Sequence, residues 1–314
     1  MTAPRVSIGL PVYNGERYLA VALDALQAQT FTDFELIISD NASTDGTPAI
    51  CSQYAAGDER IRYSRNSTNI GGAPNFRRVF HLARGEYFMW AMHDDLYAPT
   101  FLARAVEALD RDPTVVLCCA RTRVIAADGS AIRDDTTPPL RVASPRAHER
   151  FGDLVRWDYN CYEVLGLIRA SVLRQTPLMA SFIASDRALR AELGLRGRFY
   201  EIPEVLFYNR DHAERSTRVL EQHHLRGAWF DPRLAGKRVL PHWRILAEYV
   251  RCVWRVPLRH SDRWRCCWEL TRWLRVPRNL KWLAADLPIA IDPRLWEAFV
   301  RYRAGRQERS GSPT

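Results

Sequence analysis

Two adjacent carboxylates, Asp94 and Asp95, follow an apolar run that extends from Tyr87 to Met92. A short, bounded apolar run is typical of a buried strand, and the carboxyl end of such a strand is where open α/β sheets bind ligands. Buried charges need a partner, and a divalent cation is one that carboxylates bind. Asp95 could instead cap a helix over the periodic apolar segment that begins at Phe101. The stretch by itself fits both a metal site and a helix cap.

Alternating strand-like and helix-like segments must position these carboxylates. The apolar pattern predicts strands over residues 6–10, 34–38, 61–63 and 87–92, and helices over 16–28, 50–54 and 76–84. Such alternation is typical of βαβ units in a mostly parallel sheet. Right-handed crossovers would bring Pro11, Asp40 and Asp95 to one rim, which is a nucleotide crevice in doubly wound folds. The absence of GxGxxG and GxxxxGK[ST] motifs argues against a dinucleotide dehydrogenase and excludes a P-loop.

The second half of the chain gives a more varied pattern. It predicts a strand over 115–119, a hairpin turn at Asp128-Gly129, a loop over 138–150, a buried strand or short helix over 162–168, and a helix after Ser185. Ser185 or Asp186 would serve as an ordinary N-cap of that last helix.

Composition divides the chain near residue 220. The chain has 314 residues and a net charge of +9, but residues 220–314 hold 19 Lys+Arg against 9 Asp+Glu, whereas residues 1–219 hold 26 against 27. Eight of the ten Trp also lie after residue 220, and prolines 257, 277, 288 and 293 would break this region into short helices. Seven Cys without a CxxC pair favour a reducing compartment over a disulfide framework or a zinc knuckle. No signal peptide and no apolar run long enough to span a membrane are expected.

Five segments in register resemble the family 2 glycosyltransferases with the GT-A fold. They are residues 6–19, residues 34–47, residues 69–75 with 83–87, the His93-Asp94-Asp95 element in place of the family's DxD, and Ser185-Asp186-Arg187 followed by 202–212. The resemblance covers about residues 5–215. The chain has Asp40-Asn41 where the family often has two Asp, and Ser185 where the family usually has Glu.

The resemblance implies a metal-dependent, inverting reaction of a nucleoside diphosphate sugar. The residues implied to bind the nucleotide sugar are Pro11, Tyr13, Asp40, Asn41, Asn69, Asn75, Asp94 and Arg210. Asp95 and His212 would hold Mg²⁺ or Mn²⁺, and Asp186 would be the catalytic base. The alternatives are turn chemistry for Asp40 and Asn41, an exposed loop position for His212, and an ion pair with Asp211 or Glu214 for Arg210.

These residues define the expected architecture. We expect an α/β GT-A domain over residues 1–219, with a nucleotide-sugar half (1–100) and an acceptor half (101–219), and a basic, Trp-rich helical extension over 220–314. The loop at 136–160 would select the acceptor.

The expected activity is a hexosyltransferase acting on a glycan or lipid-linked hydroxyl, as in cell-envelope polysaccharide synthesis. The expected location is cytoplasmic, with the extension on an anionic inner membrane surface. The structural alternative is that the extension packs on the catalytic domain and exposes its Arg side chains to solvent. A protein that binds nucleic acid or membrane through the Arg/Trp-rich region is the rival function.

Overall fold

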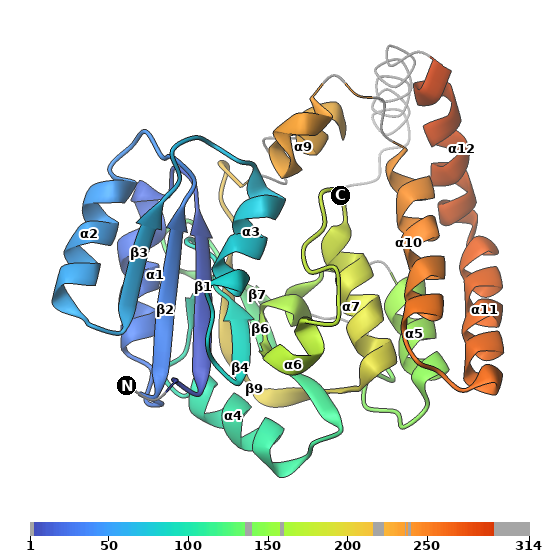
Figure 1. Cartoon of the computed structure of the whole chain (residues 1–314), viewed down its shortest axis with the longest axis horizontal. Helices are drawn as coiled ribbons and strands as arrows, with labels where there is room; N and C mark the ends of the chain where they lie inside the picture. Colours follow the sequence, from blue (N-terminus) through green and yellow to red (C-terminus); the bar gives the residue numbers. More distant parts are fainter. Residues whose placement is uncertain are drawn as a thin grey trace.

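The computed structural model describes residues 3–135, 140–157, 160–215, 223–235, 237 and 240–291 (Figure 1). The strands are β1 (Val6–Val12), β2 (Phe34–Asp40), β3 (Ile61–Arg65), β4 (Tyr87–Trp90), β5 (Leu96–Tyr97), β6 (Val115–Ile125), β7 (Ala131–Asp134), β8 (Leu167–Arg169) and β9 (Arg198–Arg210). The helices are α1 (Glu16–Gln27), α2 (Thr47–Gly57), α3 (Gly72–His81), α4 (Phe101–Arg111), α5 (Ala147–Arg156), α6 (Ala170–Leu173), α7 (Ser185–Arg196), α9 (His223–Phe230), α10 (Pro241–Arg255), α11 (His260–Leu274) and α12 (Pro277–Ile291), with 3-10 turns η1 (Tyr162–Leu165) and η2 (Pro232–Leu234).

The sheet has a parallel block and a mixed block. Its described strands run in the order β3-β2-β1-β4-β8-β6-β9-β5, with β7 paired to β6. The strands β3, β2, β1 and β4 are parallel neighbours, whereas β8 runs antiparallel to β4 and to β6. The predicted α/β fold is confirmed, and the parallel block brings the ends of β1, β2 and β4 to one rim as expected.

Strands β1, β2 and β4 are buried on both faces, as continuous apolar runs in a parallel sheet should be. Strand β4 contributes side chains to the cores on both faces of the sheet. Tyr87 and Met89 join the core under α1 and α4, whereas Phe88 and Trp90 join the core under α3 and α7. Because side chains alternate along a strand, helices on both faces fix the strand register. The rim residues that follow β4 are therefore held in one place.

Several segments differ from the sequence prediction. Asp95 does not cap a helix, because strand β5 follows it and α4 begins only at Phe101. Helix α3 begins at Gly72 rather than at Phe76, because Gly71 in the left-handed region, with φ 89°, starts it. The loop predicted over 138–150 ends where α5 begins, at Ala147. The segment 162–168 holds both predicted forms, since η1 is followed by β8.

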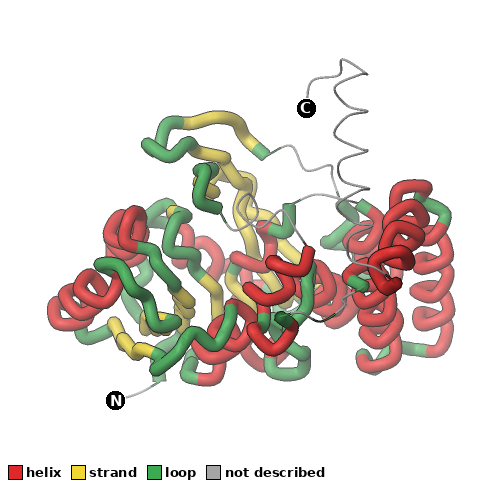
Figure 2. The backbone as a smooth tube through the Cα atoms, turned by 90° about the horizontal axis from the view of Figure 1, so that it is seen from above, coloured by secondary structure: helices red, strands yellow, loops and turns green. Residues whose placement is uncertain are grey.

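The long helices α10, α11 and α12 stand together at one end of the molecule (Figure 2). They share a third core with α5 and α7, which includes Phe151 of α5, Cys252 of α10 and Trp273 of α11. Helix α12 continues past Pro288, which was predicted to break the extension. The predicted domain boundary near residue 220, Pro293 and Trp296 lie outside the described residues.

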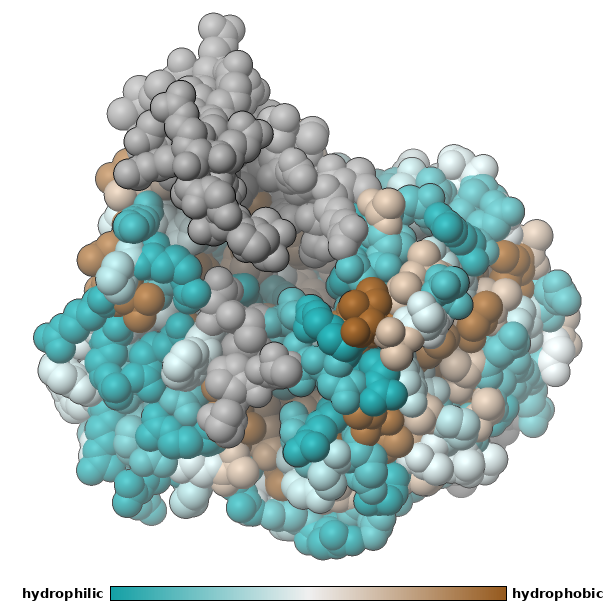
Figure 3. Space-filling model, turned by 180° about the vertical axis from the view of Figure 1, so that it is seen from behind, coloured by the Kyte–Doolittle hydropathy of each residue, from teal (hydrophilic) through white to brown (hydrophobic). Residues whose placement is uncertain are grey.

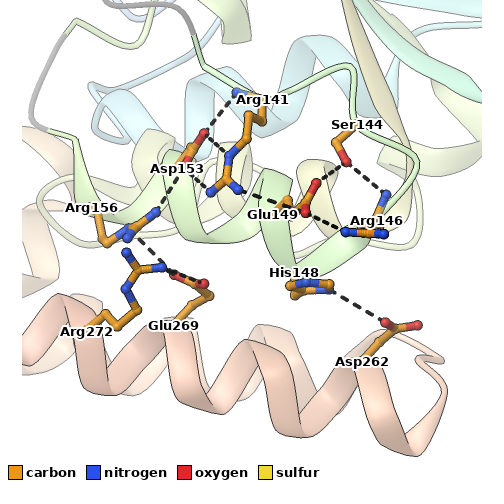
Figure 4. A network of polar contacts seen from close by, with 10 residues as sticks. All are labelled: Arg141, Ser144, Arg146, His148, Glu149, Asp153, Arg156, Asp262, Glu269 and Arg272. Atoms are coloured by element: carbon orange, nitrogen blue, oxygen red, sulfur yellow. Dashed lines mark hydrogen bonds and ion pairs between the residues drawn. The ribbon is translucent and has the colours of Figure 1, made fainter.

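Polar contacts fix α11 to α5 (Figure 4). Glu269 of α11 is buried and lies 3.6 Å from the Arg156 guanidinium of α5, while His148 lies 3.7 Å from Asp262. The helices approach closely at Gly152, where an added Cβ would meet the Glu269 carboxylate at 2.5 Å. Helix α11 is therefore packed on α5 in a defined orientation.

Among the described residues, no helix is both long enough and apolar enough to cross a membrane. Seen from behind, the described surface is mostly hydrophilic, and hydrophobic residues form small separate groups (Figure 3).

Candidate active site

Asp40, at the end of β2, is fully buried and has protein partners on both carboxylate oxygens. Its Oδ1 accepts a hydrogen bond from the Ser43 N–H at 2.8 Å, which is the turn chemistry considered above. Its Oδ2 accepts from the Tyr63 hydroxyl at 3.0 Å and lies 3.2 Å from the Arg65 Nε. The Asp40 carboxylate thus holds the backbone at this rim of the sheet in place. If Asp40 contributes to nucleotide binding, it does so by holding this backbone or by accepting a hydrogen bond on a remaining lone pair.

Asn41 organises the loop that leads into α3. Its Oδ1 accepts from the Ile70 N–H at 2.9 Å and from the Asn66 side chain at 3.0 Å. Its Nδ2 donates to Asn69 Oδ1 at 2.8 Å, and Asn75 binds Ser39 through both ends of its amide. The structure therefore brings Asn41, Asn69 and Asn75 together in one polar network beside Asp40.

Pro11 and Tyr13 lie on the neighbouring strand end. Pro11 is buried within β1, whereas the Tyr13 side chain is 41% exposed and follows directly after that strand. Asn14, in the left-handed region with φ 50°, accepts a hydrogen bond from the Thr44 N–H at 2.9 Å. An exposed aromatic ring thus lies beside a loop whose backbone is held by side chains.

Asp94 and Asp95 follow β4 and face the end of β9. The Asp94 Oδ2 lies 3.0 Å from the His212 Nε2, and both residues are largely buried. Asp95 accepts from the Asn209 Nδ2 at 3.0 and 3.2 Å and from the Arg210 N–H at 2.8 Å. The return of β9 beside β5 is what joins these residues, which are more than 100 positions apart in the sequence.

The two carboxyls differ in acidity because their partners differ. Burial and the neighbouring charge of Asp94 raise the pKa of Asp95 well above its usual range. Burial alone would raise the pKa of Asp94 as well, but the hydrogen bond with His212 and nearby positive charge hold that pKa below its usual range. A cation beside the pair would favour the charged form of Asp95.

Arg210 makes structural contacts. Its Nε donates to the Asp94 carbonyl oxygen at 2.9 Å, and its Nη1 donates to the carbonyl oxygens of Ala126 and Ala127 at 3.2 and 3.0 Å. The guanidinium also stacks over the Tyr18 ring, with its carbon 4.9 Å from the ring centroid. Neither predicted alternative, an ion pair with Asp211 or one with Glu214, is among these contacts.

Sequence reasoning did not single out Tyr18 or Asn209. The Tyr18 ring, 7% exposed, contacts both the Arg210 guanidinium and the His212 imidazole, whose centroid is 4.8 Å from that of Tyr18. Asn209 holds the Asp95 carboxylate and accepts from the Tyr162 hydroxyl at 3.2 Å. Asn209 could have been singled out because it precedes Arg210 in a motif that matches the family. Nothing in the sequence distinguishes Tyr18 from an aromatic residue of the core.

Asp186 is placed differently from the rim carboxylates. It lies in the first turn of α7, after Ala184 in the left-handed region with φ 66°. Among the described residues, none donates a hydrogen bond to its partly exposed carboxylate, and neither Ser185 nor Asp186 caps the helix through its side chain. The turn η1 links the two regions, because Tyr162 bonds Asn209 and Glu163 lies 3.4 Å from Arg190 of α7.

The donor set suits a hard divalent cation held with few protein ligands. Within the described ranges, no group of three or more His, Cys, Asp or Glu side chains has the geometry of a complete metal site. Mg²⁺ needs only one or two carboxylates when phosphate oxygens and waters complete its shell. The adjacent Asp94 and Asp95 carboxyls could supply such ligands, and the buried His212 Nδ1 has no hydrogen-bond partner in the described structure.

Known proteins resemble this chain in sequence and fold. Residues 7–177 match the model of the family described as glycosyl transferase family 2. An uncharacterized protein of Mycobacterium tuberculosis is 43% identical over 132 residues, which are 41% of this chain and 37% of that protein. The putative glycosyltransferase EpsE of Bacillus subtilis is 37% identical over 111 residues, 35% of this chain and 40% of that protein. These alignments span well under half of each curated relative.

Solved structures show the same fold at low sequence identity. S. aureus TarS 1-349 in complex with UDP superposes with a TM-score of 0.60 and 16% identity, covering 87% of this chain and 73% of that chain. The mannosyltransferase PcManGT from Pyrobaculum calidifontis, in complex with GDP-Man and Mn²⁺, gives 0.52 and 18%, covering 95% and 88%.

Proposed function

Because this chain belongs to glycosyl transferase family 2, we propose that it transfers a hexosyl group from a nucleoside diphosphate sugar to an acceptor hydroxyl with inversion. The observation that carries this proposal is a contrast between two sites. Asp94, Asp95 and His212 form a buried group at the rim, whereas the Asp186 carboxylate accepts no hydrogen bond from the described residues. The structures that share its fold bind UDP, UDP-GlcNAc or GDP-Man, which supports a nucleotide-sugar donor.

The donor would lie on the rim formed by β1, β2 and the loop before α3. Tyr13 offers an exposed ring against which a base can stack, and Asp40 and Asn41 hold the backbone around it. Asn69 and Asn75 extend that polar network. In this proposal the network acts mainly by pre-shaping the nucleotide crevice, which lowers the entropy cost of binding.

Asp95, with Asp94 and His212, would hold Mg²⁺ or Mn²⁺. When bound, such an ion supplies positive charge against the diphosphate that departs. Asn209 and the Arg210 N–H orient the Asp95 carboxylate, and Tyr18 orients His212. The protein's own contribution is thus to fix two acidic groups in a buried setting before the donor arrives.

Asp186 would accept the proton from the attacking acceptor hydroxyl. The absence of hydrogen bonds to the Asp186 carboxylate from the described residues leaves its lone pairs available to the acceptor. No covalent intermediate is needed, because the hydroxyl attacks the anomeric carbon directly while the diphosphate leaves from the opposite face.

The acceptor would be a glycan or a lipid-linked sugar, as in cell-envelope polysaccharide synthesis, bound on the side of α5, η1 and α7. The predicted acceptor loop at 136–160 contains α5, and its residues 136–139 and 158–159 lie outside the described ranges. A lipid-linked acceptor would hold the enzyme at the inner membrane surface.

The test is calorimetric binding of UDP, dTDP, GDP and CDP, each with and without Mn²⁺. We expect one nucleotide to bind in the presence of Mn²⁺ and to lose that binding without the metal or in Asp95→Asn. Asp33→Asn, an exposed carboxylate just before β2, is the matched control and should bind like the natural protein. Failure of all four nucleotides to bind with metal would overturn the proposed transferase.

A further inference from the structure

Three indole side chains of α10 and α11 are turned to solvent. Trp254, Trp264 and Trp268 are 61%, 73% and 54% exposed, respectively. Among the described residues, none accepts a hydrogen bond from their ring N–H groups, whereas Trp273 of the same helix α11 is buried. The buried stripe of α11 runs through Cys266, Leu270 and Trp273, and Trp264 lies outside it on the exposed side of the helix.

Two of these indoles lie under arginine side chains, and two share one side of α11. The Arg263 guanidinium of α11 stacks over Trp254 of α10, with 5.1 Å between its carbon and the ring centroid. Trp264 and Trp268 are four residues apart on α11 and therefore lie on the same side of that helix. Arg275 stacks over Trp268 at 5.1 Å and extends the strip to the end of α11. We call these three indoles and two guanidiniums the Trp-Arg strip.

The surroundings of the Trp-Arg strip are basic. Residues 241–286 contain ten Lys+Arg and four Asp+Glu. Of the four acids, Glu248, Glu269 and Asp286 are buried, and the Asp262 side chain is only 28% exposed. Arg259 and Lys281 are exposed and have no ion pair among the described residues. The exposed surface therefore shows positive charge with very little negative charge to neutralise it.

The opposite faces of α10 and α11 are buried in the protein core. Cys252 and Val253 of α10 and Cys266 and Trp273 of α11 pack against α5 and α7. The Glu269 contact with Arg156 of α5 holds α11 in place (Figure 4). The Trp-Arg strip is therefore presented by a fixed scaffold, and no refolding is required to expose it.

We infer that the Trp-Arg strip docks on the surface of an anionic lipid bilayer. Indoles favour the membrane interface because an apolar ring and a polar N–H can both be satisfied there. Basic side chains beside them are attracted to acidic headgroups. A nucleic acid would use similar chemistry, but single-stranded binders place such residues in a groove, whereas this strip lies on the outer side of packed helices. The inference does not depend on the donor or on the reaction.

The experiment is flotation of the full chain with vesicles of phosphatidylglycerol and phosphatidylcholine, compared with vesicles of phosphatidylcholine alone. We expect binding to the anionic vesicles at low salt, loss of binding at high salt, and little binding to neutral vesicles. The double variant Trp264→Ala/Trp268→Ala should bind about tenfold more weakly. Trp157→Ala removes a similarly exposed indole, 52% exposed, outside the strip and should bind like the natural protein.

A second measurement covers the basic residues and the folding of the variants. Arg259→Gln/Arg275→Gln should weaken binding to anionic vesicles and reduce its dependence on salt. Equal thermal melting of all variants would show that they are folded. The inference is overturned if the protein stays in the soluble fraction with anionic vesicles, or if the Trp264/Trp268 variant binds as tightly as Trp157→Ala. It is also overturned if a single-stranded RNA is bound through Trp264 and Trp268 while vesicles are not.

Discussion

The carboxylates at the rim and the carboxylate at the start of α7 differ in burial and in the hydrogen bonds that they accept. Asp40, Asp94 and Asp95 are buried or nearly so, and each is held by side chains or backbone N–H groups. Asp186 is partly exposed and receives no hydrogen bond from the described residues. A group that must keep its position is surrounded by donors, whereas a group that must accept a proton keeps its lone pairs open. Under the proposed function, this contrast corresponds to donor binding at the rim and proton transfer at α7.

The largest expected effect is that of Asp186→Asn. An amide cannot accept the acceptor proton, so kcat should fall about 10²- to 10⁴-fold, while the Kd for the donor stays within about twofold. Steady-state kinetics of sugar transfer would measure this loss. Ser185→Ala is the neighbouring control, because the buried Ser185 hydroxyl has no hydrogen-bond partner among the described residues. Near-normal turnover of Asp186→Asn would remove the assignment of the base.

Asp95→Asn should have the next largest effect, on binding and turnover together. An amide at this position places an NH₂ or an oxygen against the Arg210 N–H and Asn209 and cannot supply the charge that a cation needs. We expect about a 10- to 100-fold loss of metal affinity, measured as the Mn²⁺ dependence of nucleotide binding. An unchanged dependence on Mn²⁺ would place the metal elsewhere.

Asn41→Ala should have a smaller effect that is confined to the donor side. It removes the acceptor of the Ile70 N–H, and an N–H that stays unsatisfied costs about 1–3 kcal/mol. It also removes one of the two donors to the Asn69 side-chain oxygen, which keeps the Gly71 N–H. We expect a higher KM for the donor and little change in kcat. Thr68→Ala, in the same loop, is exposed and makes no described side-chain hydrogen bond, so it should be nearly neutral.

Substitutions at Tyr18 should have the smallest effects, and they separate the role of its ring from that of its hydroxyl. The buried Tyr18 hydroxyl has no partner among the described residues, so Tyr18→Phe should keep activity and should not lower thermal stability. Tyr18→Leu removes the ring that contacts Arg210 and His212 and should raise the Mn²⁺ concentration needed for half-maximal activity by a few-fold, about 1 kcal/mol for a lost ring contact. Equal behaviour of the Phe and Leu variants would show that the ring does not position His212.

The sequence allowed prediction of the elements whose pattern is local. The apolar runs of β1, β2 and β4 and the turn at Asp128-Gly129 follow from residue types alone, and Gly129 has a φ of 91° as such a turn needs. The rim positions of Asp40 and Asp95 followed from the parallel topology. Helix α5 was missed because its buried face, with Phe151 and Leu154, is matched by elements distant in the sequence.

Residue partnerships in the site were less predictable. The pairing of His212 with Asp94 rather than with Asp95 depends on how β9 returns beside β5. The contacts of Arg210 with three carbonyl oxygens likewise depend on the hairpin that follows β6. Residue types indicated which groups belong to the rim, but only the strand order specifies which side chains meet.

The most direct test of the division between rim and α7 is titration of the cognate nucleotide, in Mn²⁺, into Asp186→Asn and Asp95→Asn side by side. The account predicts that Asp186→Asn binds as tightly as the natural protein although its sugar transfer is lost, and that Asp95→Asn loses the metal-dependent part of binding. Equal loss of nucleotide binding in both variants would contradict it, because the two carboxylates would then serve one function.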